Sequence, residues 1–338
     1  MEFENDLRVI TVNGPVGADK LGVTDAHSHL YIAPVAGGSP DAPVLVDEDS
    51  IGRELVRFHA AGGGAVVDCQ PGGCGRDGRV LRRLSERSGI HVVAATGFHR
   101  RVYYPPDAPL FSRTAEVAAD YLRDEIANGL IETRPDSGPQ TAGNGDGLRS
   151  AVVYPGLIKI AAEASLETSP RPLFEAAAAV ARQTGYAIEM HTERGAAVAE
   201  YLAFYVGQGV SPRRLVFCHV DKRPDFGLHH ELAQAGVMLE YDTFFRPKYE
   251  PERNVWPLIQ QMADAGLAGQ LALATDMAEP GLWAEMGGRP GLLGFFTIIK
   301  AKLESLGLPP ATIGGLLGGN IAGRLAVANH RQQTTDRV

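Results

Sequence analysis

The sequence predicts an α/β fold, a (β/α)8 TIM barrel of eight parallel strands alternating with helices. Short apolar runs recur along the chain, helical segments separate them, and polar residues capable of chemistry stand where several of the runs end. The chain has 338 residues, of which 44% are hydrophobic, enough to fill a barrel interior and the layer beneath its helices. We therefore expect residues 1–338 to form one barrel domain.

The expected elements follow one another in barrel order. Strands are predicted near 22–29, 64–70, 91–98, 155–162, 186–191, 214–219, 237–242 and 271–276. Helices are predicted between them near 51–61, 76–88, 114–128, 170–184, 195–207, 225–235 and 251–265, and after the last strand near 292–305 and 310–328. Thr114 is a suitable N-cap three residues before Val117, and Pro170 and Pro172 suit a first helical turn.

Three segments have the composition of loops rather than elements. Residues 37–46 and 134–150 are rich in glycine, proline and short polar residues, and the second contains the run Gly143-Asn144-Gly145-Asp146-Gly147. Residues 277–291 form a long connection after the last strand. We expect 134–150 to be mobile, either as a plain surface insertion or as a functional loop.

Composition and charge exclude several classes of function. The net charge is −8 and no basic run offers a face that could follow phosphates, which argues against nucleic-acid binding. No apolar stretch is long enough to span a membrane, and the acidic start lacks the apolar core of a signal peptide. The three cysteines, Cys69, Cys74 and Cys218, indicate no disulfide framework. We expect a cytoplasmic protein with a small-molecule substrate, and keep a homodimer as an alternative to a monomer.

Six residues near the ends of predicted strands are candidates for a metal site. They are His27, His29, Lys159, His191, His219 and Asp276. Alternate residues of a strand share a face, so His27 and His29 can point at one ion. A lysine inside an apolar strand must be paired, deprotonated or chemically modified, because burying its charge alone is costly. Each histidine alone is more often a hydrogen-bonded core residue, but the ordered set favours two metals at one end of a barrel.

The spacing of these six residues resembles the phosphotriesterase-like family of the amidohydrolase superfamily. The resemblance runs from Val9-Ile10-Thr11-Val12-Asn13-Gly14-Pro15-Val16, similar to the opening hairpin of that family, to about Ala326. Two segments are most similar to the lactonase members, namely His191-Thr192-Glu193 with Gly195, and Cys218 to Asp225. The resemblance implies a barrel capped by an N-terminal hairpin in 1–21 and followed by C-terminal helices in 292–328.

The resemblance also implies a mechanism. Lys159, carrying carbon dioxide as a carbamate, would bridge two divalent ions; His27, His29 and Asp276 would hold the more buried ion, and His191 and His219 the more exposed one. The ligand types favour zinc, with manganese, cobalt or iron as alternatives. A hydroxide shared by the ions would attack a lactone or carboxylic ester carbonyl, and Asp276 would shuttle the proton. The alternatives are an N-acyl amide hydrolase or a phosphotriesterase with the same site, or a binding barrel without turnover.

Loops after the strands are expected to select the substrate. The predicted substrate-binding residues are His99, Arg100, Arg101, Tyr104, Arg246, Lys248, Tyr249 and Trp283. Two basic clusters at one barrel face indicate an anionic group on the substrate, unless the arginines pair with nearby acids. The segment Arg246-x-Lys248-Tyr249 resembles the loop of members that act on phosphorylated sugar lactones. Glu279 stands where those members tend to carry a basic residue, so we expect a carboxylate or a neutral acyl group rather than a phosphate.

Two further groups of residues are weaker candidates. Cys69 and Cys74 flank Gly72-Gly73, but sequence supplies no activating base for a nucleophilic thiol. Glu163 follows Lys159 by four residues and is a candidate partner for it.

Overall fold

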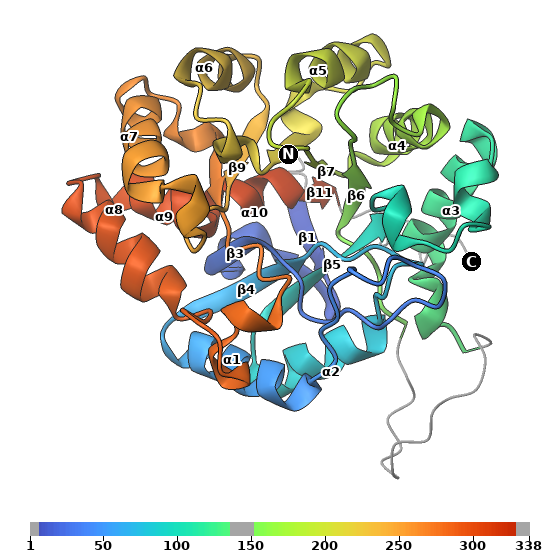
Figure 1. Ribbon diagram of the computed structural model, residues 1–338, viewed down its shortest axis with the longest axis horizontal. Coiled ribbons are helices and arrows are strands. Elements are labelled where there is room, and N and C mark those ends of the chain that lie inside the picture. The colour runs from blue at the N-terminus through green and yellow to red at the C-terminus, as the bar shows by residue number, and fades with distance from the viewer. Residues whose placement is uncertain (1–6, 136–151, 329–338) are drawn as a thin grey trace, which may run out of the picture.

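The computed structural model describes residues 7–135 and 152–328, so most of the predicted 134–150 loop lies outside the described residues. Eight parallel strands form a nearly closed barrel, which confirms the predicted fold class (Figure 1). The strands are β3 (Val23–Ser28), β4 (Gly63–Asp68), β5 (His91–Gly97), β6 (Leu157–Ala161), β7 (Ile188–His191), β8 (Leu215–Cys218), β9 (Met238–Tyr241) and β10 (Leu271–Leu273). Each pairs with the next in sequence order, as the strands of such a barrel must.

Hydrogen bonds beyond the end of β10 join the last strand segment to the first. The backbone N–H of Thr275 donates to Asp25 Oδ1 at 2.9 Å, and its hydroxyl donates to Asp25 Oδ2 at 2.5 Å. The backbone N–H of Asp276 donates to the carbonyl of His27 at 2.9 Å. These contacts set Asp276 beside His27, so the closure of the barrel also builds the site.

Within the described ranges, one α-helix follows each of the strands β3 to β9, and these helices lie around the outside of the barrel (Figure 1). They are α1 (Glu48–Ala60), α2 (Gly78–Ser88), α3 (Ala115–Asn128), α4 (Arg171–Thr184), α5 (Val198–Gly207), α6 (Phe226–Gln234) and α7 (Pro251–Asp264). The predicted cap of α3 is confirmed, because Thr114 Oγ1 accepts from the N–H of Val117 at 3.4 Å. Helix α1 begins earlier than predicted because the Asp47 side chain accepts from the N–H of Ser50 at 3.0 Å and caps it. No helix in the described ranges is long and apolar enough to cross a bilayer.

The end of the barrel at which the strands begin is closed by the first and last described elements of the chain. The predicted hairpin is confirmed as β1 (Leu7–Thr11) and β2 (Gly14–Gly17), and β11 (Val327–Ala328), which was not predicted, pairs with β1. Val9 of β1 and Ile321 and Leu325 of α10 (Asn320–Leu325) belong to the same buried apolar cluster as the inward residues of the strands. These contacts fill the barrel from below, so its open mouth lies at the carboxyl ends of the strands.

The C-terminal helices are more broken than predicted. The predicted helix 292–305 is a π-helical segment (Phe295–Lys300) followed by α8 (Ala301–Ser305). The predicted helix 310–328 is divided into α9 (Pro310–Gly314), a π-helical segment (Gly315–Gly319) and α10. The break is at Gly318, whose φ is 154° and where a Cβ would lie 2.5 Å from the carbonyl oxygen of Gly22. Close packing against the start of β3 therefore interrupts a helix that the sequence pattern alone predicts as continuous.

Candidate metal centre

The structure brings the six predicted residues together at the carboxyl ends of the strands. His27, Lys159 and His191 lie within β3, β6 and β7, whereas His29, His219 and Asp276 lie just beyond β3, β8 and β10. His219 and Asp276 have φ values of 63° and 48°, in the left-handed region that residues other than glycine rarely adopt. The chain therefore turns sharply at both positions, and the turn is held by surrounding contacts.

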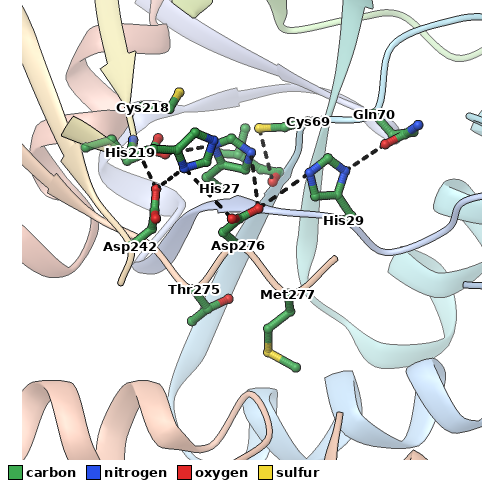
Figure 2. Close-up of polar contacts among 12 residues, drawn as sticks. His27, His29, Cys69, Gln70, Cys218, His219, Asp242, Thr275, Asp276 and Met277 are labelled. Atoms are coloured by element: carbon green, nitrogen blue, oxygen red, sulfur yellow. Dashed lines mark hydrogen bonds and ion pairs between the residues drawn. The ribbon is translucent and has the colours of Figure 1, made fainter. Parts of the chain in front are cut away.

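The carboxylate of Asp276 lies among three imidazoles (Figure 2). Its Oδ1 is 3.9 Å from His27 Nε2 and 3.7 Å from His29 Nε2, and its Oδ2 is 3.8 Å from His219 Nδ1. These separations are too long for hydrogen bonds. Two ligand atoms that each lie about 2.1 Å from one ion are separated by at most about 4.2 Å, so the spacing of Asp276 Oδ1 from the two Nε2 atoms fits atoms that share a cation. His219 Nδ1 is hydrogen-bonded to Asp242, so Nε2 is the atom of His219 that remains for an ion.

Three of the histidines also contact a buried acceptor through their Nδ1 atoms. The pairs are His27 Nδ1 with Glu240 Oε1 at 2.7 Å, His29 Nδ1 with Gln70 Oε1 at 2.8 Å, and His219 Nδ1 with Asp242 Oδ2 at 2.5 Å. Partners of this kind orient the imidazoles that bind metals and fix which nitrogen carries the proton. Sequence reasoning missed all three acceptors, although two acids alternating in the apolar strand segment 238–242 were a usable signal.

Burial keeps the imidazoles in the form that binds metal. It lowers the pKa of His27 and His219 well below the usual value, and that of His29 to about 4. It also lowers the pKa of His191, whose buried Nε2 makes no hydrogen bond among the described residues and lies 3.9 Å from Glu193 Oε2. Neutral imidazoles around a carboxylate are a donor set that fits divalent zinc or a similar ion.

Lys159 is fully buried and paired. Its Nζ lies 3.1 Å from Glu189 Oε1, 3.4 Å from His27 Nε2 and 3.6 Å from Cys218 Sγ. The thiol of Cys69 donates to the same Glu189 oxygen at 2.6 Å. Burial alone would lower the Lys159 pKa, but the thiols and carboxylates around it raise that pKa well above its usual value. Of the three states expected for this lysine, the structure shows the paired one, and its partner Glu189 was not predicted.

A cavity of about 570 Å³ opens over the cluster. Of the predicted substrate-binding residues, it is lined by His99, Arg246, Lys248 and Tyr249. Lys222 and Tyr103 line it as well, together with Glu279 and a wall from residues 32–44. Lys222 follows His219 in the sequence and was not proposed as a binding residue, although its place just after a strand end was a signal for it.

The predicted pair of arginines after β5 does not reach this cavity. Arg100 forms ion pairs with Glu163 at 3.2 Å and with Glu193 at 3.3 Å. Arg101 donates to the carbonyl of Pro105 at 2.6 Å and to that of Pro106. Both guanidinium groups therefore serve the loops around the barrel mouth. Glu163, expected near Lys159, is directed to Arg100 instead.

Two predicted aromatic residues are also absent from the cavity lining. The Tyr104 hydroxyl is buried, where it accepts from the N–H of His99 at 3.0 Å and donates to the carbonyl of Gly72 at 3.1 Å. Trp283 is fully buried, and its Nε1 donates to the carbonyl of Met277 at 3.0 Å. Each side chain satisfies its polar atom inside the fold, so both have structural roles.

The cysteines at the end of β4 are not activated as nucleophiles. Cys69 and Cys74 are both buried. Burial raises the pKa of Cys69 well above its usual value and that of Cys74 to about 12, which disfavours the reactive thiolate.

Two lysines give the cavity its positive charge. Lys222 Nζ lies 5.8 Å and Lys248 Nζ 5.2 Å from the centre of the Tyr249 ring. Within the described ranges, neither ammonium has an acidic partner within 4.0 Å. Burial would lower the Lys222 pKa, but the nearby charges of Asp242 and Asp276 raise it, so Lys222 remains protonated. The cavity thus holds two cations whose charge no ion pair neutralises.

Comparison with known proteins places this site in a family. Residues 7–320 match the model of the Phosphotriesterase family. The chain is 26% identical over 278 residues to a phospho-furanose lactonase of Mycoplasmopsis synoviae (79% of this chain, 75% of that protein). It is 27% identical over 270 residues to an N-acetyltaurine hydrolase of Rattus norvegicus (70% of this chain, 72% of that protein).

Solved structures show the same fold. An amidohydrolase from Mycoplasma synoviae superposes with a TM-score of 0.84 at 24% identity, over 97% of this chain and 94% of that one. A lactonase from Listeria monocytogenes superposes with a TM-score of 0.80 at 19% identity, over 94% of this chain and 98% of that one. Because the family model spans nearly all of the barrel and the strand ends that carry the histidines, the chain belongs to the phosphotriesterase family of hydrolases.

Proposed function

We propose that this chain is a binuclear metal-dependent hydrolase that cleaves a lactone or carboxylic ester bearing an anionic group. The observation that carries the proposal is the arrangement of one cavity, with the histidine–aspartate cluster and the unpaired Lys222 and Lys248 all in its lining. The cluster suits attack on a carbonyl, and the lysines suit an anion attached to the same molecule. An N-acyl amide is the second candidate, because it needs the same two features and N-acetyltaurine hydrolases are among the relatives.

The six residues of the cluster would hold the metals. His27, His29 and Asp276 would hold one ion, His191 and His219 would hold the other, and carbamylated Lys159 would be a ligand to both. When bound, two divalent ions supply a water of lowered pKa and polarise the substrate carbonyl. Zinc suits the imidazole and carboxylate donors, and manganese, cobalt or iron are the alternatives. Carbamylation would require the Lys159 ammonium to release a proton and to leave its pairing with Glu189. The free amine would then add to the carbon of carbon dioxide and lose a second proton to give the carbamate, an anion that bound metal ions would favour at this position.

Asp276 is proposed to move the proton. Burial would raise its pKa, but the Arg246 guanidinium, 3.0 Å from Asp276 Oδ2, outweighs burial and lowers it. Asp276 is therefore a carboxylate that can accept a proton at the start of the reaction and deliver it to the leaving oxygen. His99, which lines the same cavity and is neutral because burial lowers its pKa well below the usual value, is placed to contact the substrate.

The anionic group would occupy the space around Lys222, Lys248 and Tyr249. Two of the relatives are named for substrates that join a hydrolysable carbonyl group to a phosphate or a sulfonate, which supports an anion at this end of the cavity. Glu279 lines the same cavity and lowers its positive potential. We therefore propose a singly charged group such as a carboxylate in preference to a phosphate.

A screen with matched substrates tests the anion. Lactones, esters, N-acyl amides and phosphotriesters would be compared by a pH indicator, each as an anionic and a neutral version. Lys222→Ala and Lys248→Ala should lower kcat/KM for the anionic version by roughly ten- to a hundredfold, the loss expected for one charged contact. Lys300→Ala removes a lysine on the C-terminal π-helical segment, with its side chain 43% exposed, and is the control. Equal losses on charged and neutral substrates would contradict the anion.

Metal analysis tests the centre itself. We expect about two divalent ions per chain, as the six-ligand set implies. His27→Ala, His191→Ala and Asp276→Asn should nearly abolish turnover, and Lys159→Met should lose metal. A carbamate on Lys159 should appear as a ¹³C resonance after exchange with labelled bicarbonate. A chain that binds no metal and stays inactive after zinc or manganese is added would instead be the binding barrel without turnover.

A further inference from the structure

Arg246, which was predicted to bind substrate, donates hydrogen bonds to the barrel itself. Its Nη1 donates to the carbonyl oxygens of Asp242 and Thr275, each at 3.1 Å. Its Nη2 donates to the carbonyl oxygen of Asp276 at 2.5 Å and to the carboxylate oxygen Oδ2 of the same residue at 3.0 Å. The two terminal nitrogens carry four N–H groups, and these contacts supply four acceptors. Arg246 thus has no terminal N–H left for a substrate anion.

The contacts hold two strand ends together where the barrel ladder stops. Strand β9 ends at Tyr241 and β10 at Leu273, so the carbonyls of Asp242, Thr275 and Asp276 lie beyond the regular pairing. Buried carbonyl oxygens need a hydrogen-bond donor, and the guanidinium of Arg246 supplies it. Only 14% of the Arg246 side chain is exposed. Arg246 therefore replaces the missing ladder bonds between these two segments.

The same contacts fix the conformation of Asp276. This residue has a φ of 48°, and its carbonyl accepts from both Arg246 and the N–H of Ala278, the latter at 2.9 Å. The backbone N–H of Asp276 donates to the carbonyl of His27. A left-handed aspartate is costly unless its surroundings determine it. Arg246 is the contact that reaches both the backbone and the carboxylate of Asp276.

We infer that Arg246 is a positioning residue that holds Asp276 in its left-handed conformation and aims its carboxylate at the metal centre, and that it is not an anion contact. The inference deepens the proposed function and rests on it. It divides the basic residues of the loop after β9 into two roles. Arg246 orients the metal ligand that moves the proton, whereas Lys248 is free to meet the charged part of the substrate.

The test compares Arg246→Ala with Arg246→Lys and with Arg253→Ala. Arg253 lies seven residues further on with its side chain 80% exposed, and it controls for loss of a nearby charge. The first readout is the affinity for Co²⁺ alone, from competition with a chelator, together with the visible absorption spectrum of the Co²⁺ protein. Arg246→Ala should bind Co²⁺ about ten- to a hundredfold more weakly, as expected when an outer partner of a ligand is lost, and its spectrum should change.

The second readout is the division between kcat and KM on matched anionic and neutral substrates. Arg246→Ala should lower kcat about a hundredfold on both substrates alike, the effect of a misplaced catalytic group, with little change in KM. Added guanidinium should restore part of the metal affinity and of kcat. Arg246→Lys keeps the charge but cannot make the forked contacts, so it should retain the fold and show intermediate losses.

The outcomes separate this inference from the proposed function. Failure of the wild-type chain to bind metal would overturn the proposed function. Normal metal binding by the wild type, with Co²⁺ affinity and spectrum unchanged in Arg246→Ala, would overturn the inference alone. So would a loss confined to the anionic substrate and to KM. Should Arg246→Ala fail to fold, Arg246→Lys decides, since wild-type metal affinity and kcat in that variant would also overturn the inference.

Discussion

Replacing Asp242 by alanine should weaken metal binding without unfolding the barrel. The Asp242 carboxylate is fully buried, and its Oδ2 accepts from His219 Nδ1 at 2.5 Å and from the backbone N–H of His219 at 3.2 Å. Alanine removes the group that orients this imidazole and fixes its tautomer. A hydrogen bond to a charged partner contributes about 1.5 to 3 kcal/mol, which corresponds to a loss of roughly ten- to a hundredfold in metal affinity.

Competition with a chromophoric chelator at neutral pH measures this loss directly. Asp242→Asn keeps the shape and one accepting oxygen, so its affinity should fall between those of the wild type and Asp242→Ala. Asp225→Ala is the control, because it removes a carboxylate from the segment after β8, in which His219 also lies, and this carboxylate caps α6 by accepting from the N–H of Leu228 at 3.1 Å. It should cost about 1 kcal/mol of stability and leave metal affinity intact. Unchanged affinity in Asp242→Ala would refute the idea that this acid orients His219.

Three further predictions concern stability and pH. Glu125→Ala removes one of the two carboxylates that pair with the buried Arg76, at 2.5 Å, and leaves Glu132 at 2.7 Å, so the free energy of unfolding should fall by about 1.5 to 3 kcal/mol in urea titrations. In metal-free protein, burial lowers the His29 pKa from 6.5 to about 4, so the folded state resists protonation that the unfolded state accepts. The free energy of unfolding should therefore be unaffected by His29 above pH 6.5 and should fall by roughly 3 kcal/mol as the pH is lowered toward 4. Thermal or urea unfolding across a pH series measures this loss. Gly97→Ala would place a Cβ 1.7 Å from the Lys159 carbonyl oxygen at a φ of +122°, so metal content by elemental analysis should fall with the melting temperature.

The fold, and the gathering of the six candidate metal ligands at one end of it, could be predicted because both follow from strand ends. Parallel strands in a barrel align their carboxyl ends, so His27, Lys159, His191 and Asp276 had to meet once eight strands were recognised. No comparable rule predicts whether a side chain in a loop points into the cavity or into the core. Tyr104 and its neighbour Tyr103 both follow β5, yet only Tyr103 lines the cavity.

The buried acids around the ligands were predictable in principle. An inward lysine requires a counter-charge, and the register pairs Lys159 with Glu189 on the adjacent strand. Glu189 also precedes His191 by two residues, so it shares a strand face with a proposed ligand. Applying the rule used for His27 and His29 to each predicted strand would have found Glu189, and Glu240 with Asp242 as well. The break at Gly318 was different, because it depends on contact with Gly22, far away in sequence.

The charges of the site are arranged in two layers, which under the proposed function would separate metal binding from substrate capture. Glu240 and Asp242 are fully buried beneath the histidines, whereas Lys222 and Lys248 line the open cavity. Asp242 and Asp276 attract Lys222, as the raised pKa of that lysine shows. Divalent ions among these acids would cancel that attraction and leave Lys222 available to a substrate anion. Occupied metal positions should therefore strengthen anion capture, and because Lys248 is exposed to solvent, capture should weaken as salt is added.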